Sequence, residues 1–226
     1  MDADPSMNLG LALGVEVRGT VGSIREEMTE KIERGGWVSG VSKQEYFEYK
    51  IREALAETER FDLLVMGRPE GPGCYCYLNN VLKAFLERLE DNYRMVIVDN
   101  EAGMEHISRR ITPRLDVLIA VSDPSIKGIR AAKRIEELAR ELGLAIDTFG
   151  LVLSRAGGAL SERLREEVDK LQLPLLGIVP CDPEIEERDI EGHELLSLNG
   201  SSPAVSAVSQ IAQNIFQLVK DKEGKR

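Results

Sequence analysis

The sequence lacks a long apolar run, a secretory signal and an excess of positive charge. No stretch of the 226 residues approaches the roughly 18 consecutive apolar residues of a membrane-spanning helix, and the first residues carry no basic or apolar signal region. Asp and Glu number 39 against 29 Lys and Arg, so the net charge is −10. This balance argues against binding along a nucleic-acid backbone or on an anionic membrane. We expect a cytoplasmic protein with neither as a partner.

Aromatic residues and cysteines are also scarce. Aromatics make up 5% of the chain against an apolar content of 42%, which predicts a folded protein with a mainly aliphatic core. There are three cysteines, an odd number, so a disulfide framework is not expected. In a reducing compartment the thiols would be free or bound to metal.

Short apolar runs alternate with amphipathic segments along most of the chain. Nearly unbroken apolar runs predict strands at residues 63–66, 95–98, 117–121, 149–153 and 175–179. Helical spacing predicts helices at residues 9–13, 25–34, 46–59, 81–89, 129–142, 160–171 and 205–219. This alternation is typical of an α/β fold with a mostly parallel sheet flanked by helices. No linker rich in Gly, Ser or Pro divides the chain, so we predict a single domain over residues 1–226.

The stretch from Met66 to Asn80 combines a Gly- and Pro-rich turn with two cysteines. Cys74 and Cys76 are separated by one residue, a spacing that fits a disulfide poorly but can offer two thiolates to one soft metal ion. Because a tetrahedral site needs four ligands, a twofold dimer would complete it with the same pair from the second subunit. The alternative is that both thiols pack as small apolar side chains under the loop.

Acidic residues stand where two strands are expected to end. Asp99 closes the apolar run that precedes it, and an acid in this position can hold Mg²⁺ near nucleotide phosphates. Gly103 would let the backbone approach a terminal phosphate. Asp2 and Asp4 stand at what looks like the carboxyl end of another strand. Their functional interpretation is the positioning of a metal ion or of a water molecule in hydrolysis. The alternatives are turn or cap aspartates and a solvated terminus.

A phosphate-cradling loop of the form Gly-x-x-x-x-Gly-Lys-[Ser/Thr] is absent from the sequence. Without the amides and the lysine of that loop, phosphate affinity and stabilisation of transition-state charge would largely be lost. ATP hydrolysis by this chain alone is therefore not expected.

Residues 66–77, Met-Gly-Arg-Pro-Glu-Gly-Pro-Gly-Cys-Tyr-Cys-Tyr, resemble the carbon monoxide dehydrogenase accessory ATPases of the CooC type, which insert nickel. Residues 99–106, 122–125 and the opening Asp-Ala-Asp-Pro support a resemblance that covers nearly all of the chain. That family belongs with the septum-site, plasmid-partition and nitrogenase iron-protein ATPases. The resemblance implies a P-loop NTPase-like fold, ATP or ADP with Mg²⁺, nickel or zinc, a homodimer, and carbon monoxide dehydrogenase or a related nickel enzyme as partner.

The resemblance also implies roles for individual residues. Cys74 and Cys76 would bind the metal, and Asp4 would be catalytic, beside the hydrolytic water. Cofactor binding would involve Asp99, Gly103, Ser154, Arg155, Pro180 and Asp182. Asp99 would lie on the Mg²⁺ side, and the last four residues would lie at the base. Ser154 departs from the asparagine that the family usually carries there.

The main departure from the family lies at the start of the chain. The family begins with a strand, a Gly-Lys-Gly-Gly-x-Gly-Lys-Thr loop and a helix, which this sequence does not contain, so we expect an N-terminally truncated member. The leading hypothesis is a maturation factor that inserts nickel in an ATP-dependent way. The alternatives are a non-catalytic metal-binding or scaffold relative, and a partition or septum-site type of ATPase.

Overall fold

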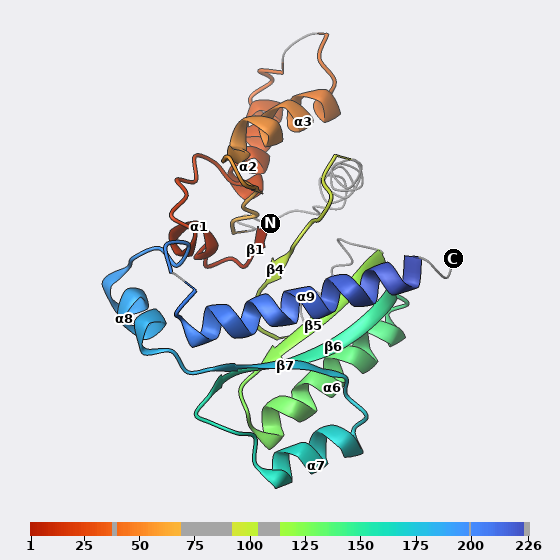
Figure 1. Ribbon diagram of the computed structural model, residues 1–226. Coiled ribbons are helices and arrows are strands. Elements are labelled where there is room, and N and C mark those ends of the chain that lie inside the picture. Colours follow the sequence, from red (N-terminus) through yellow and green to blue (C-terminus); the bar gives the residue numbers. More distant parts are fainter. Residues whose placement is uncertain (38–39, 69–91, 104–113, 199, 224–226) are drawn as a thin grey trace. The chain divides into compact units, whose positions relative to one another are not determined.

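The computed structural model describes residues 1–37, 40–68, 92–103, 114–198 and 200–223 of the chain (Figure 1). Its contacts divide the chain into two compact units. The first comprises Met1–His106 and Gly192–Leu196, and the second comprises Ile107–Glu191 and Ser197–Arg226.

The first unit contains short strands and a pair of helices. In chain order its elements are β1 (Asp2–Ala3), α1 (Leu9–Ala12), α2 (Val21–Glu33), α3 (Lys43–Ala54), β2 (Ala56–Glu57), β3 (Asp62–Leu63) and β4 (Asp99–Asn100). Strand β1 pairs in parallel with β4, with Asp2 opposite Asp99, and a parallel bridge joins Asp2 to Val65 on the other side. Strands β2 and β3 form an antiparallel hairpin.

Capping residues fix where α2 and α3 begin. Thr20 and Ser42 each accept a hydrogen bond from the backbone three residues on, and each closes a reciprocal capping box. Helix α2 therefore begins at Val21, before the predicted residue 25. Helix α3 ends at Ala54 rather than at the predicted residue 59, because the next residues form the β2–β3 hairpin, whose turn is closed by a hydrogen bond from the Thr58 amide to the Phe61 carbonyl at 3.0 Å.

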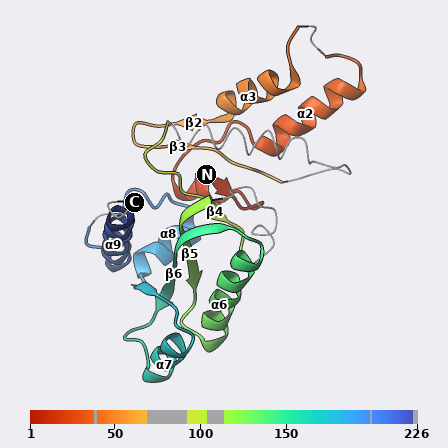
Figure 2. The same ribbon diagram turned by 90° about the vertical axis from the view of Figure 1, so that its right-hand side faces the viewer.

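The second unit is a parallel sheet between helices. Its elements are β5 (Arg114–Ser122), α6 (Ile126–Glu141), β6 (Ala145–Ala156), α7 (Glu162–Lys170), β7 (Leu175–Pro180), α8 (Pro183–Glu191) and α9 (Pro203–Glu223). The three strands pair in parallel in the order β5-β6-β7. Figure 2 shows α6 and α9 on opposite sides of this sheet. The predicted α/β class with a parallel sheet flanked by helices is confirmed.

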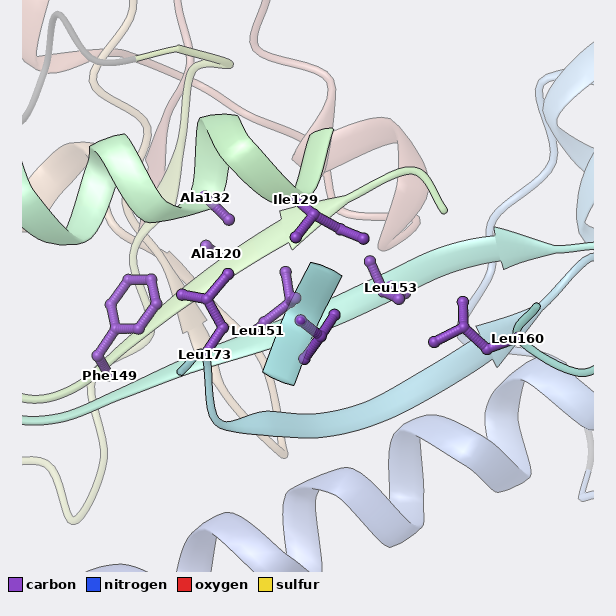
Figure 3. Packing of buried hydrophobic residues seen from close by; sticks show 9 residues of the cluster. Ala120, Ile129, Ala132, Phe149, Leu151, Leu153, Leu160 and Leu173 are labelled. Carbon is purple, nitrogen blue, oxygen red and sulfur yellow. The ribbon is translucent and has the colours of Figure 1, made fainter. Parts of the chain in front are cut away.

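The core of the second unit lies between the sheet and helices α6 and α7 (Figure 3). Leu151 and Leu153 from the central strand are fully buried, and Ile129 of α6 packs against them. On the opposite face α9 approaches β7 very closely. A Cβ placed on Gly177 would lie 2.4 Å from Cγ1 of Ile211, so this contact requires glycine in the strand.

Apart from Phe47, Phe149 and Met28, the buried apolar residues of the described part of the chain are aliphatic. No helix among these residues combines the length and apolar character needed to cross a bilayer.

Candidate functional site

Three parallel segments of the first unit end at the same edge. The Asp2 amide donates to the Leu64 carbonyl at 2.8 Å, and the Met66 amide donates to the Asp2 carbonyl at 2.8 Å. On the other side Asp2 stands opposite Asp99 in the β1–β4 pair. Because carboxyl ends of parallel strands meet at one edge, Asp4 and Gly67 follow segment ends on the same side of the unit, and Asp99 lies within β4 beside Asp2.

The Asp2 side chain organises the loop that carries Asp4. Its carboxylate is fully buried and accepts hydrogen bonds from the amides of Asp4, at 3.0 Å, and Leu9, at 3.1 Å. Asp4 in turn accepts a hydrogen bond from the Ser6 amide at 2.8 Å. Asp2 is therefore committed to the fold of the loop, and the half-buried Asp4 is the acid that the loop presents.

Negative charge accumulates around Asp99. Partial burial, followed by repulsion from Asp2 and Asp4, raises the pKa of the Asp99 carboxyl above its usual value. Gly103, four residues on, has a φ of 104°, and among the described residues no atom lies within 4 Å of where its Cβ would stand. This edge thus combines acidic charge, only partly offset by the Met1 ammonium, with the backbone of Gly103, an arrangement that suits a cation bound to an anionic ligand.

We expect Asp99→Asn to stabilise the chain at neutral pH by about 0.5 kcal/mol, a size set by screening at a partly exposed site. The folded state binds the Asp99 proton more tightly than the unfolded state does. The charge therefore lowers stability as the pH rises through the unfolded value of about 3.9 and the higher folded value. Urea unfolding at neutral and acidic pH measures this difference, with exposed Asp169→Asn as the control. A variant less stable than wild type at neutral pH would contradict it.

The N-terminus of α2 holds the segment that leads to the two cysteines. The amides of Val21 and Gly22 donate to the carbonyls of Val65, at 3.0 Å, and Met66, at 2.9 Å. A Cβ on Gly22 would lie 2.5 Å from the Arg68 carbonyl oxygen, so the two backbones are in close contact. Cys74 and Cys76, like the helix predicted at residues 81–89, lie outside the described residues. Within the described residues, no group of three or more His, Cys, Asp or Glu side chains is placed to hold a metal ion.

The predicted base-contacting residues gather at strand ends of the second unit. Ala156 stands opposite Pro180 in the β6–β7 pair, and the Cys181 amide donates to the Ala156 carbonyl at 3.1 Å. Ser154 and Arg155 therefore lie beside the end of β7. Arg155 is exposed and has a φ of 59°, a left-handed backbone conformation that is uncommon for a residue other than glycine.

The Asp182 side chain is buried and engaged within the protein. Its carboxylate accepts hydrogen bonds from the Ser202 hydroxyl at 2.6 Å, the Ala204 amide at 3.3 Å and the Glu184 amide at 3.1 Å. The Ser202 bond lowers the pKa of Asp182 against the opposing effect of burial. The resulting stability is present above the unfolded pKa of about 3.9 and is lost as the pH falls through the lower folded value.

Sequence reasoning did not identify Ser202. The available signal was Ser202 followed by Pro203 before the apolar periodicity of α9, which is the usual pairing of a helix N-cap with proline in the first turn. That signal predicts a helix start. It does not predict a hydrogen bond to an acid twenty residues earlier in the chain.

Several curated proteins are similar to this chain over most of its length. The uncharacterized ATP-binding protein MJ0685 of Methanocaldococcus jannaschii is 42% identical over 96% of this chain and 85% of its own length. The uncharacterized ATP-binding protein MJ0823 of the same organism is 30% identical over 96% and 86%. The carbon monoxide dehydrogenase accessory protein CooC of Rhodospirillum rubrum is 28% identical over 90% and 79%.

Solved structures agree on the fold. The cell division ATPase MinD of Pyrococcus furiosus matches with a TM-score of 0.62 at 23% identity, over 96% of this chain and 84% of that one. A ParA family ATPase from Chlorobium tepidum matches with a TM-score of 0.61 at 17% identity, over 95% and 83%. MinD of Pyrococcus horikoshii, solved with Mg-ADP, matches with a TM-score of 0.60 at 21% identity, over 96% and 83%. No protein-family model matches the chain.

Proposed function

Because the chain belongs to the MinD/ParA-type superfamily of P-loop ATPases, in one family with the ATP-binding protein MJ0685, we propose that it binds ATP together with Mg²⁺. The observation that carries this proposal is 42% identity over 96% of the chain to a protein named for ATP binding. The Mg-ADP in the structure of Pyrococcus horikoshii MinD gives it further support.

The strand ends of the first unit fit the phosphate side of such a ligand. Asp99 would face the Mg²⁺, whose excess charge would relieve the repulsion that raises the Asp99 pKa. Asp4 would orient a water for attack, held in place by the buried Asp2. Gly103, with its left-handed φ of 104°, would let the backbone approach a terminal phosphate. Bound Mg²⁺ would supply neutralising charge to the phosphates, while Asp99 would hold the ion and Asp4 would orient the water.

The strand ends of the second unit would serve the base. Ser154, Arg155 and Pro180 lie on adjacent strand ends, and the buried Asp182 follows directly. For hydrolysis, we propose that the 226 residues supply the acids and the loops beside the base. A loop of the form Gly-x-x-x-x-Gly-Lys-[Ser/Thr], which this sequence does not contain, would supply the lysine and amides that phosphoryl transfer requires.

We further propose that the family role is nickel insertion for carbon monoxide dehydrogenase, through Cys74 and Cys76 shared across a homodimer. The 28% identity to CooC over 90% of the chain and the Cys-x-Cys spacing support this role. The described structure adds that the segment leading to the cysteines leaves the edge where Asp4 and Asp99 lie, with its backbone held by α2. A movement of that edge on nucleotide binding would reach the cysteines through residues 65–68, whose backbone contacts α2.

The test combines metal content with molar mass. We expect the purified chain to bind about half an equivalent of Ni²⁺ or Zn²⁺ per chain, since four thiolates from two subunits surround one ion. Light scattering after gel filtration should show a dimer that ATP with Mg²⁺ favours, and Asp99→Asn should weaken this response. One metal ion per monomer would contradict the shared site. A dimer that depends on ATP but binds no metal would favour a partition or septum-site role.

A further inference from the structure

The carboxylate of Asp182 lies where two helices begin. It accepts from the Glu184 amide in the first turn of α8 and from the Ala204 amide in the first turn of α9. Negative charge is favoured at helix N-termini, where amides lack partners within the helix. One buried carboxylate therefore caps both helices.

Ser202 completes this arrangement. The residue is 2% exposed, its hydroxyl donates to Asp182 at 2.6 Å and accepts from the Val205 amide at 3.0 Å. The hydroxyl thus joins the cap of α9 to the acid that follows β7. We call Asp182 and Ser202 the capping pair.

The capping pair is coupled to the β6–β7 strand ends through very short lengths of chain. Cys181, which donates to the Ala156 carbonyl, immediately precedes Asp182. The left-handed Arg155 immediately precedes Ala156. The position of Asp182 consequently restrains the loop of Pro180 and Cys181, and this loop is hydrogen-bonded to the segment that bears Ser154 and Arg155.

Helix α8 has a second anchor that does not involve this pair. Arg188 donates to the Ser197 hydroxyl at 2.6 Å and pairs with Glu184 at 3.2 Å. Loss of the Ser202 hydroxyl should therefore shift the start of α9 and the Asp182 loop without releasing α8. The effect of the capping pair is accordingly local to the strand ends.

We propose that Asp182 and Ser202 are positioning residues for base recognition, holding the β6–β7 strand ends in the arrangement that distinguishes adenine from other bases. The inference rests on the proposed nucleotide binding and deepens it. The carboxylate of Asp182 acts through the backbone of its loop, since its oxygens are already taken by Ser202 and by helix amides.

The experiment compares the affinities of fluorescent ATP and GTP analogues, with Mg²⁺, for the full chain. Ser202→Ala should weaken ATP binding roughly tenfold, the size expected for a mispositioned hydrogen-bonding loop, and leave GTP binding nearly unchanged. The dissociation constant for GTP divided by that for ATP should therefore fall roughly tenfold. Asp182→Asn is the second variant and should shift the ratio in the same direction. Ser209→Ala, an exposed serine on α9, is the matched control and should leave both affinities as they are.

The ratio separates positioning from mere stability, because a partly unfolded variant loses both nucleotides equally. Circular dichroism of each variant fixes the folded fraction. Equal loss of ATP and GTP affinity, or an unchanged ratio in both folded variants, would overturn the inference alone. A wild-type chain that binds both nucleotides equally well would overturn it too. Wild-type protein that binds neither nucleotide would overturn the proposed function, and the inference with it.

Discussion

Replacing Cys74 or Cys76 with serine is expected to lower bound metal from about half an equivalent per chain to none. Each substitution removes one thiolate from each subunit, so the shared site loses two of its four ligands. A serine hydroxyl stays protonated at neutral pH and is a poor ligand for a soft ion, whereas a thiolate is a strong one. Metal analysis of the desalted protein after incubation with Ni²⁺ or Zn²⁺ measures the loss.

The third cysteine of the chain provides the matched control. Cys181 is a free, exposed thiol directly after β7. Cys181→Ser should retain the metal content of the wild type, because an isolated surface thiol offers one ligand where a tetrahedral site needs four. Retention of metal by Cys74→Ser together with loss in Cys181→Ser would refute the Cys-x-Cys assignment.

The same variants separate the leading proposal from the scaffold alternative. In an ATP-dependent insertion factor, nucleotide closes the dimer and aligns the thiolates, so metal content should rise with ATP and Mg²⁺. In a scaffold that only binds metal, the metal content and dimer mass would be the same with and without nucleotide. Metal content and dimer mass are measured on the same samples. If the metal itself joins the subunits, Cys76→Ser should lose both the bound metal and the dimer.

The sheet of the second unit follows from unbroken apolar runs, although only the central strand β6 is buried along its run, while Ile119 and Val121 of β5 are exposed. The runs at residues 117–121, 149–153 and 175–179 are almost purely apolar, and they became β5, β6 and β7 with added residues at most ends. Helix α6 was equally clear, since Ile129 and Ala132 recur at helical spacing on its buried side. Packing against a core selects apolar residues in runs or at regular spacing, and the sequences of these elements show such patterns.

Elements without such a pattern were missed. Helix α8 has no buried residue, so its sequence shows no apolar stripe, and its start is fixed by Asp182. The β2–β3 hairpin has strands of only two residues, too short for alternation to show. The predicted helix at 46–59 extends over the first strand of this hairpin because Ala54 and Leu55 continue the apolar spacing from Ile51. Hydrogen bonds in the hairpin turn and at the start of α8 decide these boundaries, and the spacing of apolar residues does not reveal them.

The candidate site divides in the same way. Parallel pairing brings Asp99 beside β1, after which Asp4 follows, but β4 covers Asp99–Asn100 and not the strand predicted at residues 95–98. The buried role of Asp2 was not predictable, since an acid near a terminus gives no sign that its carboxylate accepts from the Asp4 and Leu9 amides. The capping pair is likewise a contact between segments that are distant in sequence.

Leu151→Ala is expected to lower the free energy of unfolding by about 2–5 kcal/mol, the range for deletion of a fully buried leucine side chain. Leu151 is 0% exposed and lies in the central strand among the residues of Figure 3. Leu175→Ala is the matched control, because Leu175 belongs to the neighbouring strand but is 39% exposed and should cost less. Urea unfolding followed by far-ultraviolet circular dichroism measures both. Equal costs for the two leucines would contradict this placement of the core.

The same variant tests the proposal that residues 1–226 form a single domain. The chain has one tryptophan, Trp37, which lies in the first unit with its ring 5.4 Å from that of Tyr46. Leu151 lies in the second unit, so Trp37 fluorescence reports the other unit. In a cooperative single domain the fluorescence midpoint shifts with the circular dichroism midpoint, because both units unfold together. A fluorescence midpoint that stays at the wild-type value would show two domains that unfold separately, and the base-side loops would then belong to a domain of their own.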